Sequence, residues 1–222
     1  MITHHPKHEL LQLHVKGALP ASISAAVSMH AELCSRCNNK LKELTLSESN
    51  TAFDLNTDML NSQTDSLEAD FSSMIDSITS NNQVYVESPY IPSKVNVRDK
   101  EYVIPRAIDS IGRSDWQNLG KLCRSRLDLN EGELHTSLLH IDPKGNVPPH
   151  THKGFELTLL LDGSFEDELG TYIKGDFIWL DKSHTHTPET KNGCLCYTVS
   201  SDALQFTKGL ARILNPIGNF IY

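Results

Sequence analysis

The chain has 222 residues, of which 38% are hydrophobic and 22% are charged, and its formal net charge is -8. This composition is typical of a globular protein, and no apolar run approaches the roughly 18 residues that cross a membrane. Residues 1–90 hold five Lys and Arg against eleven Asp and Glu. This excess argues against direct nucleic-acid binding by this part, because phosphate contacts need basic side chains. A basic protein partner fits better, with an ordinary acidic surface as the alternative.

The N-terminal residues and the cysteines predict a cytoplasmic location. The start of the chain, MITHHPKHELLQLH, scatters histidines and a lysine among its apolar residues, whereas a secretory signal needs a continuous apolar region. The chain has five cysteines, and an odd number suits a reducing compartment. In that setting the spacing of Cys34 and Cys37 indicates metal or redox chemistry rather than a disulfide framework.

The first eighty or so residues have the periodicity of helices. The segment PKHELLQLHVKGAL is expected to form a helix that stops near Gly17. A second helix is expected from Ala21 to Leu46, after Pro20. A third is expected from Leu67 to Ile78, where apolar residues recur at spacings of four, three, one and three and form one stripe. The polar residues 47–66 between them predict a loop or a weak helix.

From Val84 onward, short apolar runs alternate with Gly, Pro, Asn and Asp, which predicts an all-β barrel or sandwich. We therefore expect a two-domain α + β protein, with a helical domain over residues 1–85, a linker near 83–95 and a β domain over residues 95–222. The expected strands are Tyr102–Pro105, Lys121–Leu129, Glu133–Ile141, Phe155–Asp162, Ser164–Glu168, Gly175–Leu180, Leu195–Ser200 and a C-terminal pair near Leu204–Phe206 and Ile213.

A first candidate metal site lies on the second predicted helix, in MHAELCSRC. His30, Cys34 and Cys37 stand at positions i, i+4 and i+7 and would project from one helix face. Imidazole and thiolate ligands together favour zinc in a closed four-coordinate site. The fourth ligand would come from the N-terminal histidines, which are His4, His5 and His8. A redox pair of cysteines, or two unrelated thiols beside a histidine, is the alternative; His14 has no partner at a useful spacing.

A second candidate site lies in PPHTHKGFE. His150 and His152 alternate and would point to the same side of a strand, and Glu156 returns to that side if the strand is regular. Inside a barrel, such side chains can surround an ion together with a histidine from a facing strand. His184 and His186 are the candidates for that histidine. Three imidazoles and a carboxylate bind Zn, Ni, Mn or Fe, so the ligands alone do not choose the metal.

These two motifs together resemble a known family. The pattern H-x3-C-x2-C after an N-terminal histidine is similar to the zinc-binding anti-sigma domain, in particular the ChrR type, in which a cupin domain follows. The run H-x-H-x3-E-x6-G, which ends at Gly163, resembles the first cupin motif. The second motif departs from the general cupin pattern, because it lacks the Pro-x-Gly turn and the closing Asn. The resemblance implies a C-terminal cupin, the double-stranded β-helix barrel.

The resemblance also implies particular ligands. The N-terminal ligand would be His5, the second of a His-His pair, which stands 25 residues before His30. The sequence His-Thr-Pro marks His186 as the histidine of the second cupin motif. The metal would be zinc in the helical domain, and zinc or another divalent ion in the cupin, with zinc favoured.

The function that the resemblance implies is that of an anti-sigma factor, not an enzyme. The helical domain would sequester an extracytoplasmic-function (ECF) sigma factor, with the acidic residues and the stripe of 67–78 as contact surface. It would release the sigma factor when the cupin receives an oxidative signal such as singlet oxygen or an organic peroxide. The alternative is a mononuclear-metal cupin enzyme, a dioxygenase or isomerase, with a helical oligomerisation module. A homodimer is left open.

Several other residues have local interpretations. His135 and His140 lie on a strand without a motif and are expected to be structural. Cys194 and Cys196 alternate on a strand, where thiols pack as small apolar groups; a role as oxidant sensors is the alternative. Cys123 receives no role from its surroundings in the sequence.

Overall fold

In the computed structural model, residues 1–54, 68–81, 89–202 and 204–206 are described. The chain divides into two compact units, one of Met1–Lys42 with Pro92–Tyr222 and one of Glu43–Ile91. The boundaries at 85 and 95 therefore stay a prediction, since the first helices form one unit with the β domain. None of the helices in the described part of the chain is long and apolar enough to span a bilayer.

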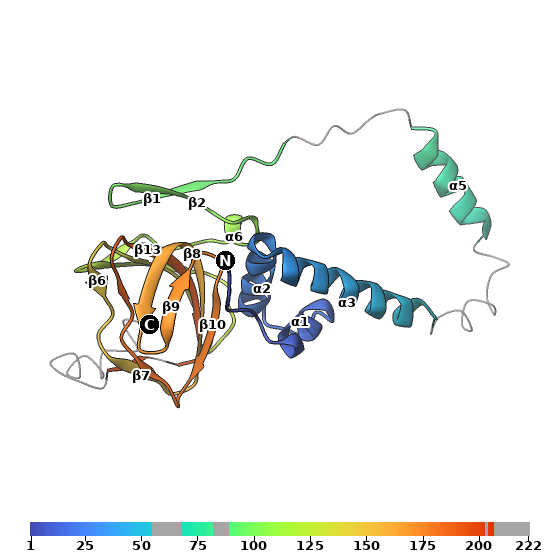
Figure 1. Cartoon of the computed structure of the whole chain (residues 1–222). Helices are drawn as coiled ribbons and strands as arrows, with labels where there is room; N and C mark the ends of the chain where they lie inside the picture. Colours follow the sequence, from blue (N-terminus) through green and yellow to red (C-terminus); the bar gives the residue numbers. More distant parts are fainter. Residues whose placement is uncertain (55–67, 82–88, 203, 207–222) are drawn as a thin grey trace. The chain divides into compact units, whose positions relative to one another are not determined.

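The N-terminal part is helical, as expected (Figure 1). Gly17 follows the first helix with a φ of 65°, a left-handed conformation that glycine adopts without a steric cost, so it ends the helix. The third predicted helix is also present, and part of the polar segment before it is helical too, while residues 55–67 lie outside the described residues. These helices are α1 (His8–Val15), α2 (Ala21–Leu33), α3 (Ser35–Asp54) and α5 (Glu68–Thr79).

The prediction of one continuous helix from Ala21 to Leu46 is wrong, because the chain breaks at Cys34. The backbone of Cys34 is extended, with φ -122° and ψ 101°, and a new helix starts at Ser35. The physical reason is the axial distance between His30 and Cys37 on a continuous helix. On a straight helix, positions i and i+7 are separated by about 10 Å along the axis, so side chains of His30 and Cys37 would not reach one ion. The break changes the direction of the chain and removes that separation.

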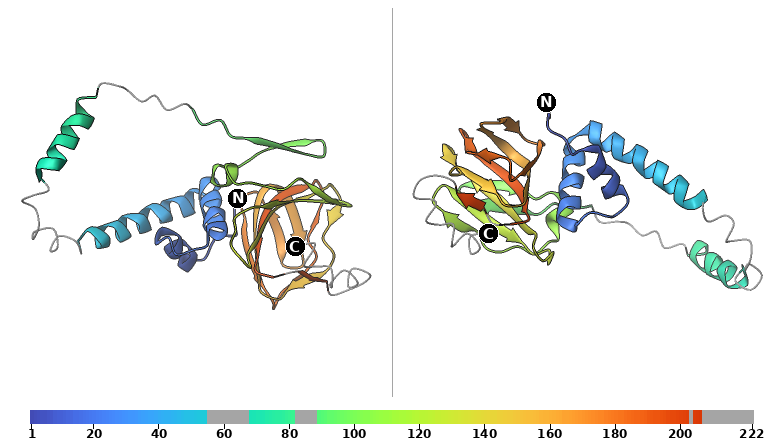
Figure 2. Two further views of the ribbon diagram at one scale, coloured as in Figure 1. Left: turned by 180° about the vertical axis from the view of Figure 1, so that it is seen from behind. Right: turned by 90° about the horizontal axis from the view of Figure 1, so that it is seen from below.

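The C-terminal part is a curled antiparallel sheet, which is the predicted all-β cupin barrel (Figures 1 and 2). Among the described strands, the main sheet has the order β3-β4-β5-β13-β8-β12-β6, with β9 and β10 also paired to β8, and a second sheet has the order β11-β7-β14. A separate hairpin joins β1 and β2, and a short helix, α6 (Arg106–Asp109), follows it. The strands are β1 (Lys94–Val97), β2 (Lys100–Val103), β3 (Gln117–Leu119), β4 (Leu122–Leu127), β5 (His135–Ile141), β6 (Gly145–Asn146), β7 (His150–His152), β8 (Phe155–Asp167), β9 (Gly170–Ile173), β10 (Phe177–Asp181), β11 (Thr185–His186), β12 (Glu189–Thr190), β13 (Cys194–Ser200) and β14 (Leu204–Phe206).

The expected strands correspond to β2, β4, β5, β8, β10, β13 and β14, with two differences in the centre. The runs 155–162 and 164–168 form one strand, β8, which turns a corner at Gly163 with a φ of 78°. Before this corner β8 pairs with β13, and after it β8 pairs with β9. The strand β9 was not predicted, because the run GTYI is short. It forms a hairpin with the end of β8. Ile213 lies outside the described residues.

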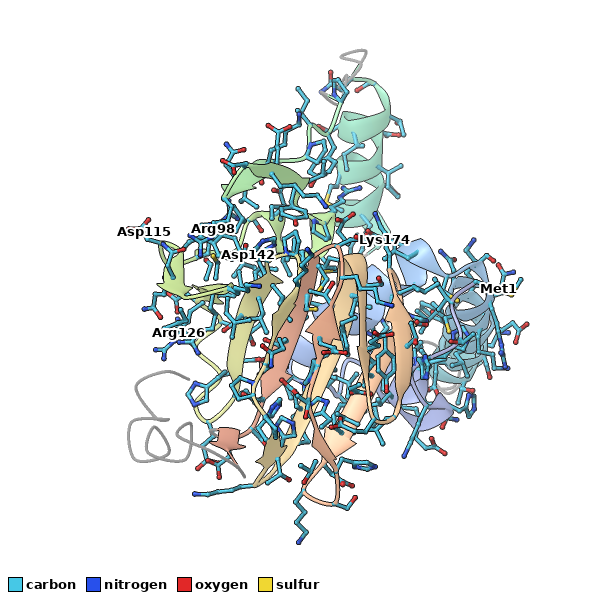
Figure 3. All side chains as sticks on the ribbon, turned by 60° about the vertical axis from the view of Figure 1, so that its left-hand side comes forward. Met1, Arg98, Asp115, Arg126, Asp142 and Lys174 are labelled. Atoms are coloured by element: carbon cyan, nitrogen blue, oxygen red, sulfur yellow. The ribbon has the colours of Figure 1, made fainter. Side chains whose placement is uncertain are left out.

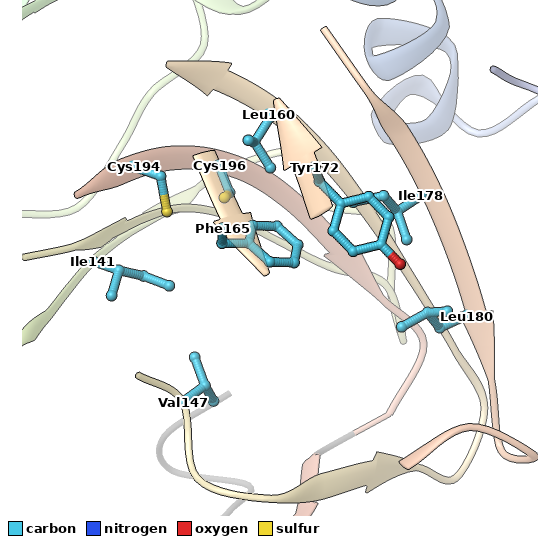
Figure 4. Close-up of a cluster of buried hydrophobic side chains, with 9 residues drawn as sticks. All are labelled: Ile141, Val147, Leu160, Phe165, Tyr172, Ile178, Leu180, Cys194 and Cys196. Carbon is cyan, nitrogen blue, oxygen red and sulfur yellow. The ribbon is translucent and has the colours of Figure 1, made fainter. Parts of the chain in front are cut away.

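The barrel encloses an apolar cluster between its curved faces (Figure 4). Alternate residues of β13, together with residues of β5, β8, β9 and β10, point into it, as the two-residue period of a strand requires. The two thiols of β13 lie within this cluster, which is the packing expected from the sequence. Its buried members are Ile141, Val147, Leu160, Phe165, Tyr172, Ile178, Leu180, Cys194 and Cys196.

Helix α2 packs against the outer side of this barrel, next to β8 and β13. The hydroxyl of the fully buried Tyr197 in β13 donates a hydrogen bond to the carbonyl oxygen of Ser22 at 2.8 Å. Because β13 is covered by α2 on one side and faces the barrel interior on the other, all seven of its residues are buried, which explains its nearly continuous apolar run.

Candidate metal centres

The structure brings together the four residues of the first candidate site. His5 comes from the N-terminal segment, His30 from the end of α2, Cys34 from the break between helices and Cys37 from the first turn of α3. One ligand atom from each lies within 4.8 Å of all the others, and all but His5 are buried. Residues far apart in the chain thus converge on one point.

The distances within this cluster fit a tetrahedral zinc ion. Nδ1 of His5 lies 3.4 Å from Nε2 of His30 and 3.5 Å from each of the Cys34 and Cys37 sulfur atoms. At zinc bond lengths of about 2.05 Å to nitrogen and about 2.3 Å to sulfur, the corners of a tetrahedron lie about 3.3 Å apart for two nitrogens and about 3.6 Å for nitrogen and sulfur. The three distances from His5 therefore match those of a zinc-centred tetrahedron, and the other ligand atoms lie within 4.8 Å of one another.

The protonation of the cluster also suits a cation. The Nδ1–H group of His30 donates to the carbonyl oxygen of Gly175 at 2.7 Å, which leaves the lone pair of Nε2 facing the cluster. Burial lowers the pKa of His30 and of His5, so both imidazoles are neutral at pH 7. Burial, reinforced by the adjacent Cys34 thiol, raises the pKa of Cys37 to about 11, so zinc binding would have to displace its proton.

The other N-terminal histidines lie outside the cluster. The ring of His4 packs on Tyr172 with its centroid 4.8 Å away, and His8 is exposed on α1. His14, expected to lack a partner, contacts the Ser24 hydroxyl through Nδ1 at 2.8 Å. Of the candidates, His5 is the one that reaches the cluster.

The second candidate site lies inside the barrel, where His150, His152, Glu156 and His186 also have ligand atoms within 4.8 Å of one another and are all buried. The condition of a regular strand through the motif is not met, because the chain bends at Lys153 and Gly154, so that the histidines lie on β7 and Glu156 on β8. The bend turns the carboxylate back toward the histidines. His186 reaches the site because β11 pairs with β7, opposite His150.

The distances at this second site do not choose one coordination geometry. Nε2 of His186 lies 2.9 Å from Nε2 of His150 and 3.4 Å from Nε2 of His152, and Oε2 of Glu156 lies 3.1 Å and 3.8 Å from Nε2 of His152 and His186. Bonds of about 2.1 Å separate neighbouring ligand atoms by about 3.0 Å in an octahedron and about 3.4 Å in a tetrahedron. Both geometries fit, so the metal is not identified.

The Nε2 atoms of His150 and His186 face each other in this site. Nδ1–H of His150 donates to the carbonyl oxygen of Pro148 at 2.8 Å, and Nδ1–H of His186 donates to the Asp167 carboxylate at 2.9 Å. Each hydrogen bond leaves Nε2 without a proton on a neutral ring. Two such acceptors 2.9 Å apart repel each other, and a cation between them removes the repulsion.

Electrostatics inside the barrel support the same conclusion. Burial lowers the pKa of His150 to about 4, so this ring is neutral. Burial alone would raise the pKa of Glu156, but the hydrogen bond from His152 and the nearby imidazoles bring it down to about 2, so the carboxylate is ionised. The Glu156 carboxylate and the Nε2 lone pairs of His150 and His186 form a site for a divalent cation.

The remaining histidines take structural positions. His184 is partly exposed and contacts Asp181 at 3.0 Å, outside the barrel site. His140 is buried and lies 3.0 Å from Asp142, a carboxylate that also faces Arg98 at 3.6 Å (Figure 3). His135 is exposed at the start of β5.

The residues that orient the ligands were not predicted from the sequence. These are Asp167, which contacts His186, and Gly175, which contacts His30 through its carbonyl oxygen. An acidic residue in a hairpin and a backbone carbonyl carry no distinct pattern in a single sequence. The contact between His30 and Gly175 joins residues 145 positions apart.

Comparison with known proteins agrees with this geometry. Residues 106–203 match the family model described as the ChrR Cupin-like domain, so the barrel is similar to the domains of that family.

The chain is 28% identical over 226 residues to the anti-sigma-E factor ChrR of Cereibacter sphaeroides, with 97% of each chain covered. It also matches the crystal structure of Rhodobacter sphaeroides SigE in complex with the anti-sigma ChrR, at a TM-score of 0.64 and 24% identity, covering 90% of this chain and 100% of that chain. The predicted resemblance to ChrR-type anti-sigma factors is thus confirmed along nearly the whole chain.

Proposed function

We propose that this protein is an anti-sigma factor that sequesters an ECF-type sigma factor and releases it when the barrel receives an oxidative signal. The observation that carries the proposal is the similarity to an anti-sigma factor over 97% of the chain, combined with two four-residue clusters that suit metal ions. A sigma factor acts with RNA polymerase, so such a partner places the protein in the cytoplasm.

In this proposal a zinc ion is held by His5, His30, Cys34 and Cys37. Zinc supplies a rigid link between the start of the chain, α2 and α3, which adds stability to a helical part with a small core of its own. The barrel holds zinc or another divalent ion through His150, His152, Glu156 and His186.

The contact surface for the sigma factor would include the stripe of α5. Phe71, Met74, Ile75 and Ile78 share one face at helical spacing, and each is at least 52% exposed. An amphipathic helix of this kind binds in an apolar groove of a partner. The sequence has no basic residue between Leu44 and Asn82, so a basic rim around that groove would complement the acidic residues of this segment.

The size of the barrel cavity supports a receiver rather than an enzyme. The cavity beside His150, Glu156 and His186 measures about 30 Å³, which holds one or two waters but no organic substrate of ordinary size. A small oxidant such as singlet oxygen fits this volume. Release requires that the oxidised barrel favour the sigma-free state by several kcal/mol.

The test is co-purification of the chain with an ECF sigma factor. The wild type should form a one-to-one complex, and Cys34→Ala and Cys37→Ala should lose it. The matched control is Cys123→Ala, because Cys123 is buried in the barrel, where its thiol donates to Asn118, and it belongs to neither cluster. An undiminished complex with either variant of the N-terminal cluster would refute the zinc-held interface.

A further inference from the structure

The turn between β9 and β10 of the barrel holds the N-terminal segment of the chain. Asp176 is fully buried, and its Oδ1 atom accepts hydrogen bonds from the backbone N–H groups of Thr3 and His4 at 2.8 and 2.9 Å. Oδ2 accepts the backbone N–H of Ile173 at 2.9 Å. The backbone N–H of Phe177 donates to the carbonyl oxygen of His4 at 3.1 Å. The residue next in sequence to this anchored stretch is His5.

The same turn contacts the second imidazole of the cluster. The Gly175 carbonyl oxygen accepts the Nδ1–H of His30 and so fixes the tautomer that presents Nε2 to the cluster. Gly175 has a φ of 93°, and a Cβ atom there would lie 2.4 Å from Cδ1 of Ile2. Because Ile2 could move aside, it is the left-handed φ that favours glycine here, and the backbone of the barrel approaches the metal ligands closely.

The barrel also fixes the other end of α2. No side chain of the helix itself caps its N-terminus, and the carboxylate of Glu131, from the loop between β4 and β5, accepts the backbone N–H groups of Ala21 and Ser22. An anion at a helix N-terminus is a favourable partner for the unpaired N–H groups. The helix that carries His30 is thus tied to the barrel at both ends.

We infer that the β9–β10 turn of the barrel, through the Asp176 carboxylate and the Gly175 carbonyl, positions the two imidazole ligands of the N-terminal metal site. Both groups act through the ligands and not on the metal, as the hydrogen-bonding partners of metal-bound histidines generally do. The inference rests on the N-terminal metal site proposed above.

This arrangement connects the two candidate centres through one strand. β10 starts next to Asp176, pairs along β8 so that Leu180 lies opposite Glu156, and continues toward His186.

The test uses the full-length chain with Co²⁺ in place of zinc. Only the N-terminal cluster contains thiolates among the two candidate sites, so the cobalt–thiolate absorption band reports that site alone. Asp176→Asn replaces one acceptor with an NH₂ group, which conflicts either with the Ile173 N–H or with those of Thr3 and His4. We expect a tenfold to hundredfold loss of affinity at the thiolate site and faster hydrogen exchange in residues 2–5.

The matched control is Asp181→Asn, at the opposite end of β10. Asp181 also accepts a backbone N–H, from Ser183 at 2.9 Å, but it contacts neither cluster, so affinity at the thiolate site should equal that of the wild type. If Asp176→Asn fails to fold, Thr3→Pro removes one donor to Asp176 without altering the barrel and should also weaken binding.

Wild-type affinity in a folded Asp176→Asn or Thr3→Pro protein would overturn the inference. An equal loss in Asp181→Asn would also overturn it, because the effect would then be a general one of strand β10. If the wild-type chain shows no cobalt–thiolate band, the N-terminal cluster does not bind metal, and the proposed function is refuted as well. This result differs from wild-type affinity in a variant, which refutes the inference alone.

Discussion

Asp167 offers a sharp test of the barrel site, because its carboxylate determines which nitrogen of His186 carries the proton. Oδ2 accepts Nδ1–H of His186 at 2.9 Å, and Oδ1 accepts the backbone N–H groups of Leu169 and Gly170 at 2.8 and 3.1 Å. In Asp167→Asn, the amide oxygen can serve only one of these two sets. If it keeps the backbone donors, its NH₂ group faces His186 and forces Nδ1 to accept.

The consequence is the wrong tautomer at the metal position. With Nδ1 accepting, the proton of His186 moves to Nε2, which then points at the ligand cluster and cannot coordinate. Losing such a partner of a metal-bound histidine costs about tenfold to hundredfold in metal affinity, which corresponds to about 1.4–2.7 kcal/mol. We therefore expect Asp167→Asn to weaken binding of a divalent ion in the barrel by this amount.

The assay is competition of Zn²⁺ between the full-length chain and a chromogenic chelator. Asp181→Asn is the matched control, because Asp181 contacts His184 at 3.0 Å in the same kind of pair but outside the site. Unchanged affinity in Asp167→Asn, or an equal loss in Asp181→Asn, would refute the reasoning from tautomers.

Three further predictions follow from the same structure. Gly163→Ala should lower the free energy of unfolding by about 2–5 kcal/mol in urea titrations, for two reasons. The added Cβ would lie 2.2 Å from the Gly193 carbonyl oxygen, which overpacks the site, and the φ of 78° is strained for any residue with a Cβ. Gly170→Ala, where no described atom lies within 4 Å of the added Cβ, should change it little, and equal effects would contradict the steric argument. Zinc affinity at the N-terminal cluster should rise at least tenfold per pH unit between about pH 6.5 and about pH 8.5. The Cys37 thiol with its pKa of about 11 must lose a proton on binding, while the two imidazoles are already neutral. A flat profile in chelator competition would show that the cluster does not bind zinc through thiolates. The double variant Met74→Asp, Ile75→Asp should weaken binding of the sigma factor at least tenfold by calorimetry, because both side chains are more than half exposed on the α5 stripe and a charge opposes burial in an apolar groove. Ser73→Asp is the control, because Ser73 is also exposed. Equal affinities of the wild type, the double variant and the control would show that α5 is not part of the interface.

Much of the fold follows from local patterns in the sequence. The stop at Gly17, the helical stripe of residues 67–78 and the alternation of the barrel strands all result from periodicity and turn chemistry within a few residues. These patterns act on neighbouring positions, so they are readable in one chain. The corner at Gly163 and the unpredicted strand β9 depended instead on which strands pair with β8.

The spacing within the two motifs indicated three residues of each cluster, and the family resemblance selected His5 and His186 as the fourth members. Only the tertiary structure decided how they meet. It broke the helix at Cys34, bent the chain between His152 and Glu156, and placed the Asp176 carboxylate on the N–H of Thr3, 173 positions away. Contacts at such separations depend on how the whole barrel closes, and no local period in the sequence encodes them.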